Sequence, residues 1–170
     1  MTPGIRKLAF TVHLASSVGW IGAVIAYLAL GVSAVSSQDA LTVRAAWIAM
    51  EVTGWFAIVP LALAALLTGL VMSLVTPWGL FRHYWVLTTL VLTILSTLVL
   101  LLHMPTVSAM ADVARAADGA DLRRLGGDLL HPGIGLVVLL AIAVLNVYKP
   151  RGLTRYGWRK QYERREEPQL

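Results

Sequence analysis

Cysteine is absent from this chain of 170 residues. Without thiols the protein cannot form disulfides, iron–sulfur clusters, thiolate metal sites or covalently attached c-type haem. Acidic residues are also few, because nine aspartates and glutamates stand against fourteen lysines and arginines, for a formal net charge of +5. Any metal site must therefore draw its ligands from the four histidines and a small set of carboxylates.

Apolar residues are abundant, making up 58% of the chain and giving a mean hydropathy of +0.73. They gather in four runs, which with their flanks predict membrane spans at residues 8–35, 47–75, 84–103 and 131–148. A helix needs about 20 apolar residues to cross the hydrocarbon core of a bilayer. We therefore predict an all-α membrane protein, with a four-transmembrane-helix bundle at residues 1–148 and a basic tail at residues 149–170. After the third span, helical spacing continues from Val107, either as a short surface helix or as an extension of that span past Pro105.

The basic residues are distributed unevenly between the two sides of this predicted bundle. Ten of the fourteen lysines and arginines fall on the side of the two chain termini. The other side has four, which are Arg44, Arg115, Arg123 and Arg124. Because lysine and arginine are retained on the cytoplasmic side of a membrane, both termini are expected in the cytoplasm. The expected location is the inner (plasma) membrane of a cell, crossed several times.

The tail holds most of this positive charge and mixes it with aromatic residues. The tail residues expected to contact lipid headgroups or a partner protein are Arg151, Arg155, Trp158, Arg159 and Lys160. Basic and interfacial aromatic side chains together suit an anionic inner leaflet, so membrane lipids are expected as partners and nucleic acid is not. The alternative is a tail that only anchors the C-terminus on its side of the membrane. A homo-oligomer or a place in a larger membrane complex is also open.

Two spans carry polar side chains at helical spacing, which predicts the faces that pack together. In the first span, one stripe is formed by His13, Ser16, Ser17, Trp20 and Tyr27. A neighbouring stripe of small residues, which let a second helix approach closely, holds Ala15, Gly19, Gly22 and Ala26. In the third span, an inward seam with hydroxyls expected to hydrogen-bond across helices comprises Thr89, Thr93, Ser96, Leu100 and His103.

At a rise of about 1.5 Å per residue, the polar side chains of the different spans fall into two layers. The inner layer is expected to bring His13 close to Thr68, Thr89 and Asn146. The outer layer is expected to contain Glu51, His103, Met104 and His131, with Tyr27 and Trp47 near them. Each layer thus offers a histidine inside or beside the membrane, where ionisable groups are often functional.

Two histidines at one depth are suitable ligands for a b-type haem or a transition-metal ion. His103 and His131 form the better pair, and His13 with His83 forms a weaker inner pair. The candidate cofactor ligands are His13, which also lies inside an apolar run, His103 and His131. Glu51 would complete a two-histidine, one-carboxylate metal site with the outer pair. Simpler roles remain open, because an interfacial histidine needs no ligand, His13 can serve only in packing and Glu51 can pair with Arg44.

The first span contains the stretch His13-Leu14-Ala15-Ser16-Ser17-Val18-Gly19-Trp20-Ile21-Gly22. Its histidine, small residues, tryptophan and glycine pair resemble the first-span signature of several small bacterial membrane families. These are domains of unknown function, the copper-resistance D type and the haem-binding protoporphyrinogen oxidase of the J type. The resemblance implies that His13 is an axial haem ligand.

The chain as a whole is most similar to an uncharacterised family of small four-span bacterial membrane proteins. This similarity is carried by Trp-Gly-Leu-Phe-Arg-His-Tyr-Trp at residues 78–85 and by Tyr-Lys-Pro-Arg-Gly at residues 148–152. The J-type oxidase has a lysine early in its third span, whereas this chain reads Val86-Leu87-Thr88-Thr89 there. That difference argues against the oxidase activity.

Three functions remain open at this stage, and whether the protein is an enzyme is open with them. The first is a redox or sensory membrane protein that binds haem b or a transition metal. The second is a subunit of a permease for metal ions or small solutes, although the five methionines and the absence of cysteine argue against tight handling of Cu⁺. The third is a non-catalytic accessory or scaffold protein, which needs no cofactor.

Overall fold

The computed structural model describes residues 2–75, 79–122 and 125–166, and within them four helical stretches are long and apolar enough to cross a membrane. These stretches are Pro3–Ser36, Ala40–Val75, Tyr84–Ala116 and Leu130–Tyr148. The predicted all-α bundle of four membrane helices is therefore confirmed. Trp78, Arg123 and Arg124, which entered the sequence predictions, lie outside the described residues.

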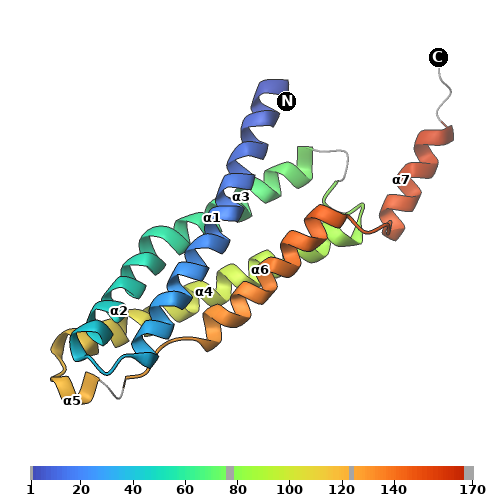
Figure 1. The fold of residues 1–170 in the computed structure, drawn as a ribbon. Helices are drawn as coiled ribbons and strands as arrows, with labels where there is room; N and C mark the ends of the chain where they lie inside the picture. Colours follow the sequence, from blue (N-terminus) through green and yellow to red (C-terminus); the bar gives the residue numbers. More distant parts are fainter. Residues whose placement is uncertain (1, 76–78, 123–124, 167–170) are drawn as a thin grey trace.

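The helices follow one another up and down the bundle (Figure 1). Their bounds are α1 Pro3–Ser36, α2 Ala40–Thr53, the π-helical turn η1 Gly54–Ile58, α3 Val59–Val75, α4 Tyr84–Ala116, α5 Gly119–Leu122, α6 Leu130–Tyr148 and α7 Arg155–Glu166. Helix α1 packs against α2, α3 and α6, and α4 packs against the same three helices from the opposite side. Helices α1 and α4 are therefore diagonal neighbours, and α6 closes the bundle between them.

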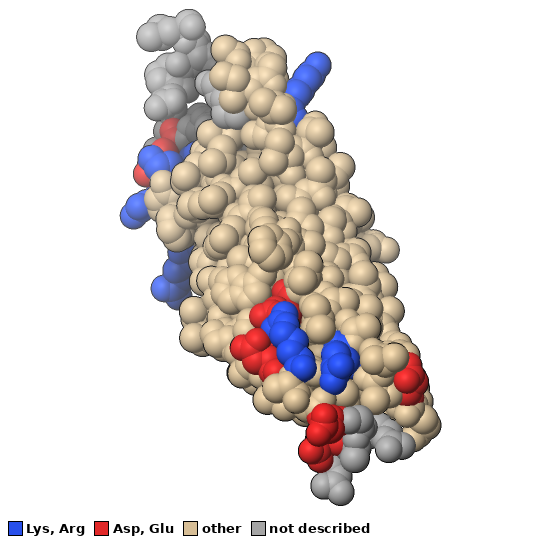
Figure 2. Space-filling model, turned by 90° about the vertical axis from the view of Figure 1, so that its left-hand side faces the viewer, with Lys and Arg blue, Asp and Glu red and all other residues tan. Residues whose placement is uncertain are grey.

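The length of α6 indicates where the membrane lies. Its 19 residues extend about 28 Å, close to the ~30 Å thickness of a hydrocarbon core. The other three spans have 33 to 36 residues and therefore project beyond that core. Figure 2 agrees with this placement, because its charged side chains lie toward the two ends of the molecule and leave a wide uncharged band between them.

The two ends of the bundle differ in how tightly they pack. We call the end with the connections 37–39 and 125–129 the loop end, and the end with the N-terminus and α7 the terminal end. The most fully buried large side chains gather at the loop end, and they are Met50, Met104, Leu122, Val43 and Val107. At the terminal end, α1 and α3 diverge from α4 and α6 (Figure 1). The core therefore lies near the loop end, where α2, α4 and α5 extend past the end of α6.

Helix α4 continues without interruption through Pro105 to Ala116, so the extended form of the third span is the correct alternative. The second span, in contrast, contains the π-turn η1 directly before Pro60. There the Val59 N–H bonds to the Gly54 carbonyl, five residues back, while Pro60 has no N–H to continue the regular pattern. Gly54 also leaves room for Met104, since a Cβ at Gly54 would lie 2.7 Å from its sulfur.

Two expectations about helix faces need correction. Gly19 contacts Leu61 of α3 as a small residue should, but a Cβ added at Gly22 would meet nothing within 4 Å. The expected cross-helix hydrogen bonds from Thr89 and Thr93 are wrong, because their hydroxyls donate to carbonyls of α4 itself at 3.0 and 2.7 Å. A threonine hydroxyl reaches the carbonyl three or four residues back in its own helix, which satisfies it without a neighbouring helix.

The position of the core can be tested with two residues of α4 that lie two positions apart in the sequence. Met104 is 1% exposed and Leu102 is 70% exposed. Met104→Ala is expected to lower the free energy of unfolding by about 2 kcal/mol, near the lower end for soluble cores, because lipid adds little hydrophobic drive to packing. Leu102→Ala, the control, should change it by less than about 0.5 kcal/mol. Unfolding in detergent measures both, and equal losses would contradict this assignment of the core.

Candidate metal centre

Three side chains that can ligate a metal meet at the loop end. His103 Nε2 lies 2.6 Å from Asp128 Oδ2, and His131 Nδ1 lies 3.7 Å from Asp128 Oδ1. One ligand atom from each of the three falls within 4.8 Å of the others. We call these residues the His–Asp–His cluster. The predicted outer pair of histidines is thus brought together, with their rings stacked at a centroid distance of 4.0 Å.

Each member of the cluster comes from a different local structure. His103 projects from the middle of α4, Asp128 lies in the connection before α6, and His131 lies in the first turn of α6. The spacing of Asp128 and His131, three residues apart at a helix start, places both side chains on one side of the chain. Because the length of α6 matches a hydrocarbon core, the cluster at its start is expected where the bilayer meets water.

The connection before α6 reaches this position by backbone contact with α1. A Cβ at Gly31 would lie 2.8 Å from the Asp128 carbonyl oxygen, and a Cβ at Gly127 would collide with the Gly31 carbonyl. Both positions therefore require glycine for space, since contacts below 3.0 Å are not tolerated by a real Cβ. Gly126 takes a left-handed conformation with φ of 60°, which glycine adopts at little cost.

Two side chains around the cluster hold the connection in place. The Tyr27 hydroxyl of α1 donates to Asp128 Oδ2 at 2.9 Å. The Trp47 indole N–H of α2 donates to the Gly126 carbonyl at 3.2 Å. The Asp128 carboxylate is thus oriented from α1 and from α4 together, as the carboxylates of metal sites are usually oriented by outer-shell hydrogen bonds. Tyr27 and Trp47 were both expected near this layer.

The accessibility of the cluster suits an exchangeable ligand. The side chains of His103 and Asp128 are 17% and 11% exposed, and that of His131 is 52% exposed. Metal-bound nitrogen and oxygen donors at about 2.1 Å from the ion lie roughly 3.4 Å from one another in a tetrahedral site. The observed separations of 2.6 and 3.7 Å lie on either side of that value, so binding an ion would require His103 and Asp128 to exchange their direct hydrogen bond for the metal and His131 to turn toward it.

A haem does not fit between these two histidines. A porphyrin held by two histidines needs their ring nitrogens directed at the iron from opposite faces of the macrocycle. The rings of His103 and His131 instead lie nearly parallel, 22° apart, with their faces in contact. The donor set of the cluster therefore matches a single ion and does not match a haem between the rings.

Glu51 lies apart from the cluster. Its carboxylate forms an ion pair with Arg115 of α4, which also bonds Asp112 at 2.6 Å. Arg44, the alternative partner expected for Glu51, instead donates to the carbonyls of Ala114 and Ala117 at 2.9 and 2.7 Å. The carboxylate beside the two histidines is thus Asp128, and Glu51 takes a structural part near the end of α4.

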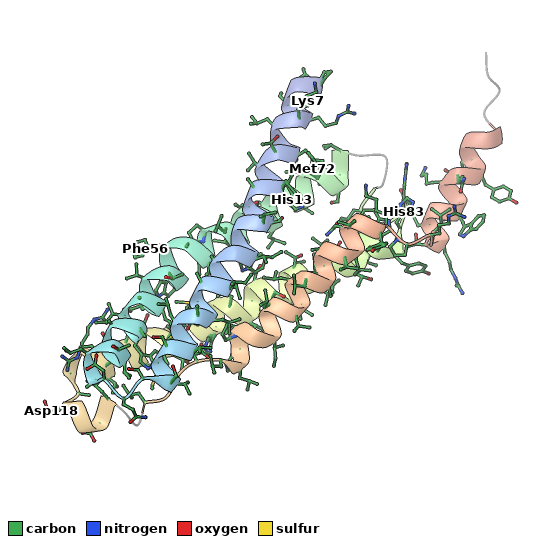
Figure 3. All side chains as sticks on the ribbon, in the orientation of Figure 1. Lys7, His13, Phe56, Met72, His83 and Asp118 are labelled. Carbon is green, nitrogen blue, oxygen red and sulfur yellow. The ribbon has the colours of Figure 1, made fainter. Side chains whose placement is uncertain are left out.

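His13 lies far from the other candidate ligands, at the same level of the bundle as Met72 (Figure 3). Its Nδ1 is 3.1 Å from the Thr68 hydroxyl of α3, and its ring lies against Gly69. The expected proximity of His13 and Thr68 is therefore confirmed, but Asn146 bonds only the Ile142 carbonyl of its own helix. Fourteen residues separate His13 from Tyr27, which is about 21 Å along α1.

The tail residues predicted to bind lipid fall into two groups. Arg151, Trp158 and Lys160 line a cavity beside the start of α4, whereas Arg155 and Arg159 are not among its lining residues. Lys160 Nζ lies 2.8 Å from the Glu163 carboxylate. This hydrogen bond raises the pKa of Lys160 and lowers the pKa of Glu163. The helical form of α7 itself was not predicted from the sequence.

No known protein family, curated protein or solved structure matches this chain. The resemblances carried by residues 13–22, 78–85 and 148–152 therefore stay predictions.

Asp128 is the member of the cluster that the sequence did not reveal as a ligand. Its spacing to His131, Asp-x-x-His directly before a membrane span, is the pattern that could have found it. Depth along the helices pointed to Glu51 instead, because depth does not show on which side of its helix a carboxylate lies. The fold of the connection over Gly31 decides between the two carboxylates.

The backbone contact at Gly31 can be tested against a second glycine of the same helix. Gly31→Ala is expected to push the connection away from α1 and lower the melting temperature by several degrees, in line with a loss of about 1–3 kcal/mol for overpacking. Gly22→Ala meets no atom within 4 Å and should be neutral or stabilising, since alanine favours helices. Thermal unfolding in detergent compares them. If both variants behave alike, the close approach is not structurally important.

Proposed function

We propose that this multi-pass membrane protein binds one divalent transition-metal ion through His103, Asp128 and His131. The convergence of two imidazoles and one carboxylate, with donor separations of 2.6 and 3.7 Å, is the observation that carries this proposal. His103 and Asp128 are 25 residues apart in the sequence, so their meeting is a product of the fold. Three protein ligands leave coordination positions open for water or another small ligand.

The chemistry of the donors narrows the choice of ion. Imidazole and carboxylate without sulfur suit Zn²⁺, Cu²⁺, Ni²⁺ or Fe²⁺, whereas Cu⁺ prefers thiolate or thioether ligands. Within the divalent series, Cu²⁺ and Zn²⁺ bind such sites more tightly than Mn²⁺ or Fe²⁺. A site with open positions and a half-exposed histidine exchanges its ion with solution. That property suits a sensory or redox role better than a closed structural site.

The orientation of the protein belongs to the same proposal. The terminal end faces the cytoplasm and the cluster faces the other side of an inner (plasma) membrane, in keeping with the retention of basic residues on the cytoplasmic side. At the loop end, Arg44 caps carbonyls of α4 and Arg115 pairs with Glu51 and Asp112. Both arginines thus have structural partners there, which explains why these two basic residues lie on the side that we place outside the cytoplasm. The metal would then be drawn from outside the cytoplasm.

Metal binding is tested with purified full-length protein, using Zn²⁺ for stoichiometry and Co²⁺ for its visible spectrum. Wild type is expected to bind about one ion and to gain about 2.7 kcal/mol of stability at a hundredfold excess over the dissociation constant. His103→Ala and Asp128→Asn should weaken binding by more than about 100-fold, beyond the effect of outer-shell changes. Tyr27→Phe removes only an orienting hydrogen bond and should cost about 10- to 100-fold.

His13→Ala is the matched control, because it also removes a histidine side chain. His13 lies about 21 Å along α1 from Tyr27, which contacts the cluster. This variant should leave the stoichiometry, the affinity and the Co²⁺ spectrum unchanged. A wild-type protein that binds neither ion would overturn the proposal and leave the cluster as a packing network. An equal loss of binding in His13→Ala would also contradict it.

The orientation is tested by labelling, which is simple because the chain has no cysteine of its own. Gln38→Cys lies in the exposed connection at the loop end, and Gln161→Cys lies exposed in α7 at the terminal end. In intact spheroplasts, a membrane-impermeant maleimide should label Gln38→Cys and should reach Gln161→Cys only after lysis. The reverse pattern would place the cluster in the cytoplasm and refute the orientation.

A further inference from the structure

A second site lies at the opposite end of the bundle, where the tail folds back on the start of α4. A cavity of about 790 Å³ opens there between the connection before α4, the linker after α6 and the helix α7. Its basic lining residues are Arg82, Lys149, Arg151 and Lys160. Its aromatic lining residues are His83, Trp85 and Trp158. Figure 3 shows His83 beside α7, at this junction.

Basic residues predominate over acidic ones in the lining of the cavity. No aspartate or glutamate is among its lining residues within the described part of the chain. The four basic lining residues come from three segments: Arg82 precedes α4, Lys149 and Arg151 follow α6, and Lys160, which pairs with Glu163, lies in α7. Such a convergence of lysine and arginine concentrates positive potential, which attracts phosphate and other anions.

Backbone contacts build this cavity and hold its walls together. The Thr154 N–H donates to the Arg82 carbonyl at 3.0 Å, and the Tyr84 N–H donates to the Gly152 carbonyl at 3.3 Å. Gly157 lies directly on the Arg82 backbone, where a Cβ would collide with the Arg82 carbonyl group. The tail is therefore docked through its main chain, so the fold holds together the segments that carry the basic side chains.

Lys149 adds an independent observation. It ends α6 in a left-handed conformation with φ of 45°, and it is the one non-glycine residue with positive φ among those described. Glycine or asparagine usually occupies this position after a helix, and a lysine there adopts an unfavourable backbone conformation. Residues held in such conformations concentrate at ligand-binding sites. The lysine side chain at this point lines the cavity.

The cavity lies at the membrane boundary marked by the end of α6. Exposed aromatic side chains lie at or next to its lining residues in the sequence, and they are Tyr84, Tyr148 and Trp158. Such aromatics favour the headgroup region. We propose that this cavity binds the phosphate headgroup of an anionic membrane phospholipid. The acyl chains would lie along the exposed apolar faces of α4 and α6, and Arg82, Lys149 and Arg151 would contact the phosphate.

The proposal is tested by native mass spectrometry of the full-length protein, released from mixed micelles of phosphatidylglycerol and phosphatidylcholine. Wild type should retain phosphatidylglycerol in preference to phosphatidylcholine. The double variant Arg82→Gln/Arg151→Gln should lower the retained phosphatidylglycerol by about tenfold or more, given the contribution of each basic side chain to anionic lipid binding. The matched control Arg155→Gln/Arg159→Gln removes the same charge from residues that do not line the cavity, and it should retain the lipid.

Three further variants separate the effect of the cavity's shape from the effect of its charge. Gly157→Val keeps every basic side chain but should undock α7 and reduce retention, whereas Gly152→Ala, whose Cβ would meet only the Tyr84 ring at 3.7 Å, should not. Lys149→Gly should reduce retention without lowering the melting temperature, because it relieves the backbone conformation. Equal losses in the two arginine double variants would overturn the proposal in favour of general surface charge. Equally tight binding of soluble glycerol phosphate would overturn the assignment to a lipid.

Discussion

The backbone contact between α1 at Gly31 and the connection before α6 is the constraint on which the rest of the bundle depends. Helices in a bilayer gain little from the hydrophobic effect when they pack, so close contacts and hydrogen bonds must hold them together. Within Leu130–Tyr148, Leu139 is the one buried residue. Polar contacts therefore hold α6 at both of its ends. Asp128 before its start joins Tyr27 of α1 and His103 of α4, and Gly152 after its end accepts a hydrogen bond from the Tyr84 N–H. The same contact at Gly31 that closes the bundle assembles the His–Asp–His cluster.

The two ends of the molecule gather ionisable groups of different kinds. At the loop end, imidazoles and carboxylates lie together, as His103 does with Asp128. At the terminal end, basic residues converge on a cavity that has no carboxylate among its described lining residues. A cluster of imidazoles and carboxylate can hold a cation, whereas a cluster of guanidinium and ammonium groups can hold an anion. The short span α6 separates these two environments by about the thickness of a bilayer.

The predictions from the sequence were correct for positions along the helix axes. The length of the apolar runs predicted four spans, and the rise per residue placed Thr68 beside His13 and Tyr27 near His103. The predictions failed where rotation about a helix axis mattered. Glu51 was expected beside the two histidines, but Asp128 is the carboxylate that reaches them, and Thr89 satisfies its hydroxyl within α4 rather than across the bundle. The depth of a residue in the membrane follows from counting residues along its helix. The rotation of a helix about its axis depends on all of its contacts with neighbouring helices.

The amino-acid sequence by itself determined the all-α class and the four spans, because the need to satisfy backbone hydrogen bonds in lipid leaves few alternatives for long apolar runs. It also determined which ligand types are available, since it contains histidine and no cysteine. Only the tertiary structure decided that Asp128 joins His103 and His131, and that Arg82 and Lys149 share a cavity. These residues come from segments far apart in the chain. Their meeting depends on close backbone contacts at Gly31 and Gly157, and no local pattern specifies where such contacts form.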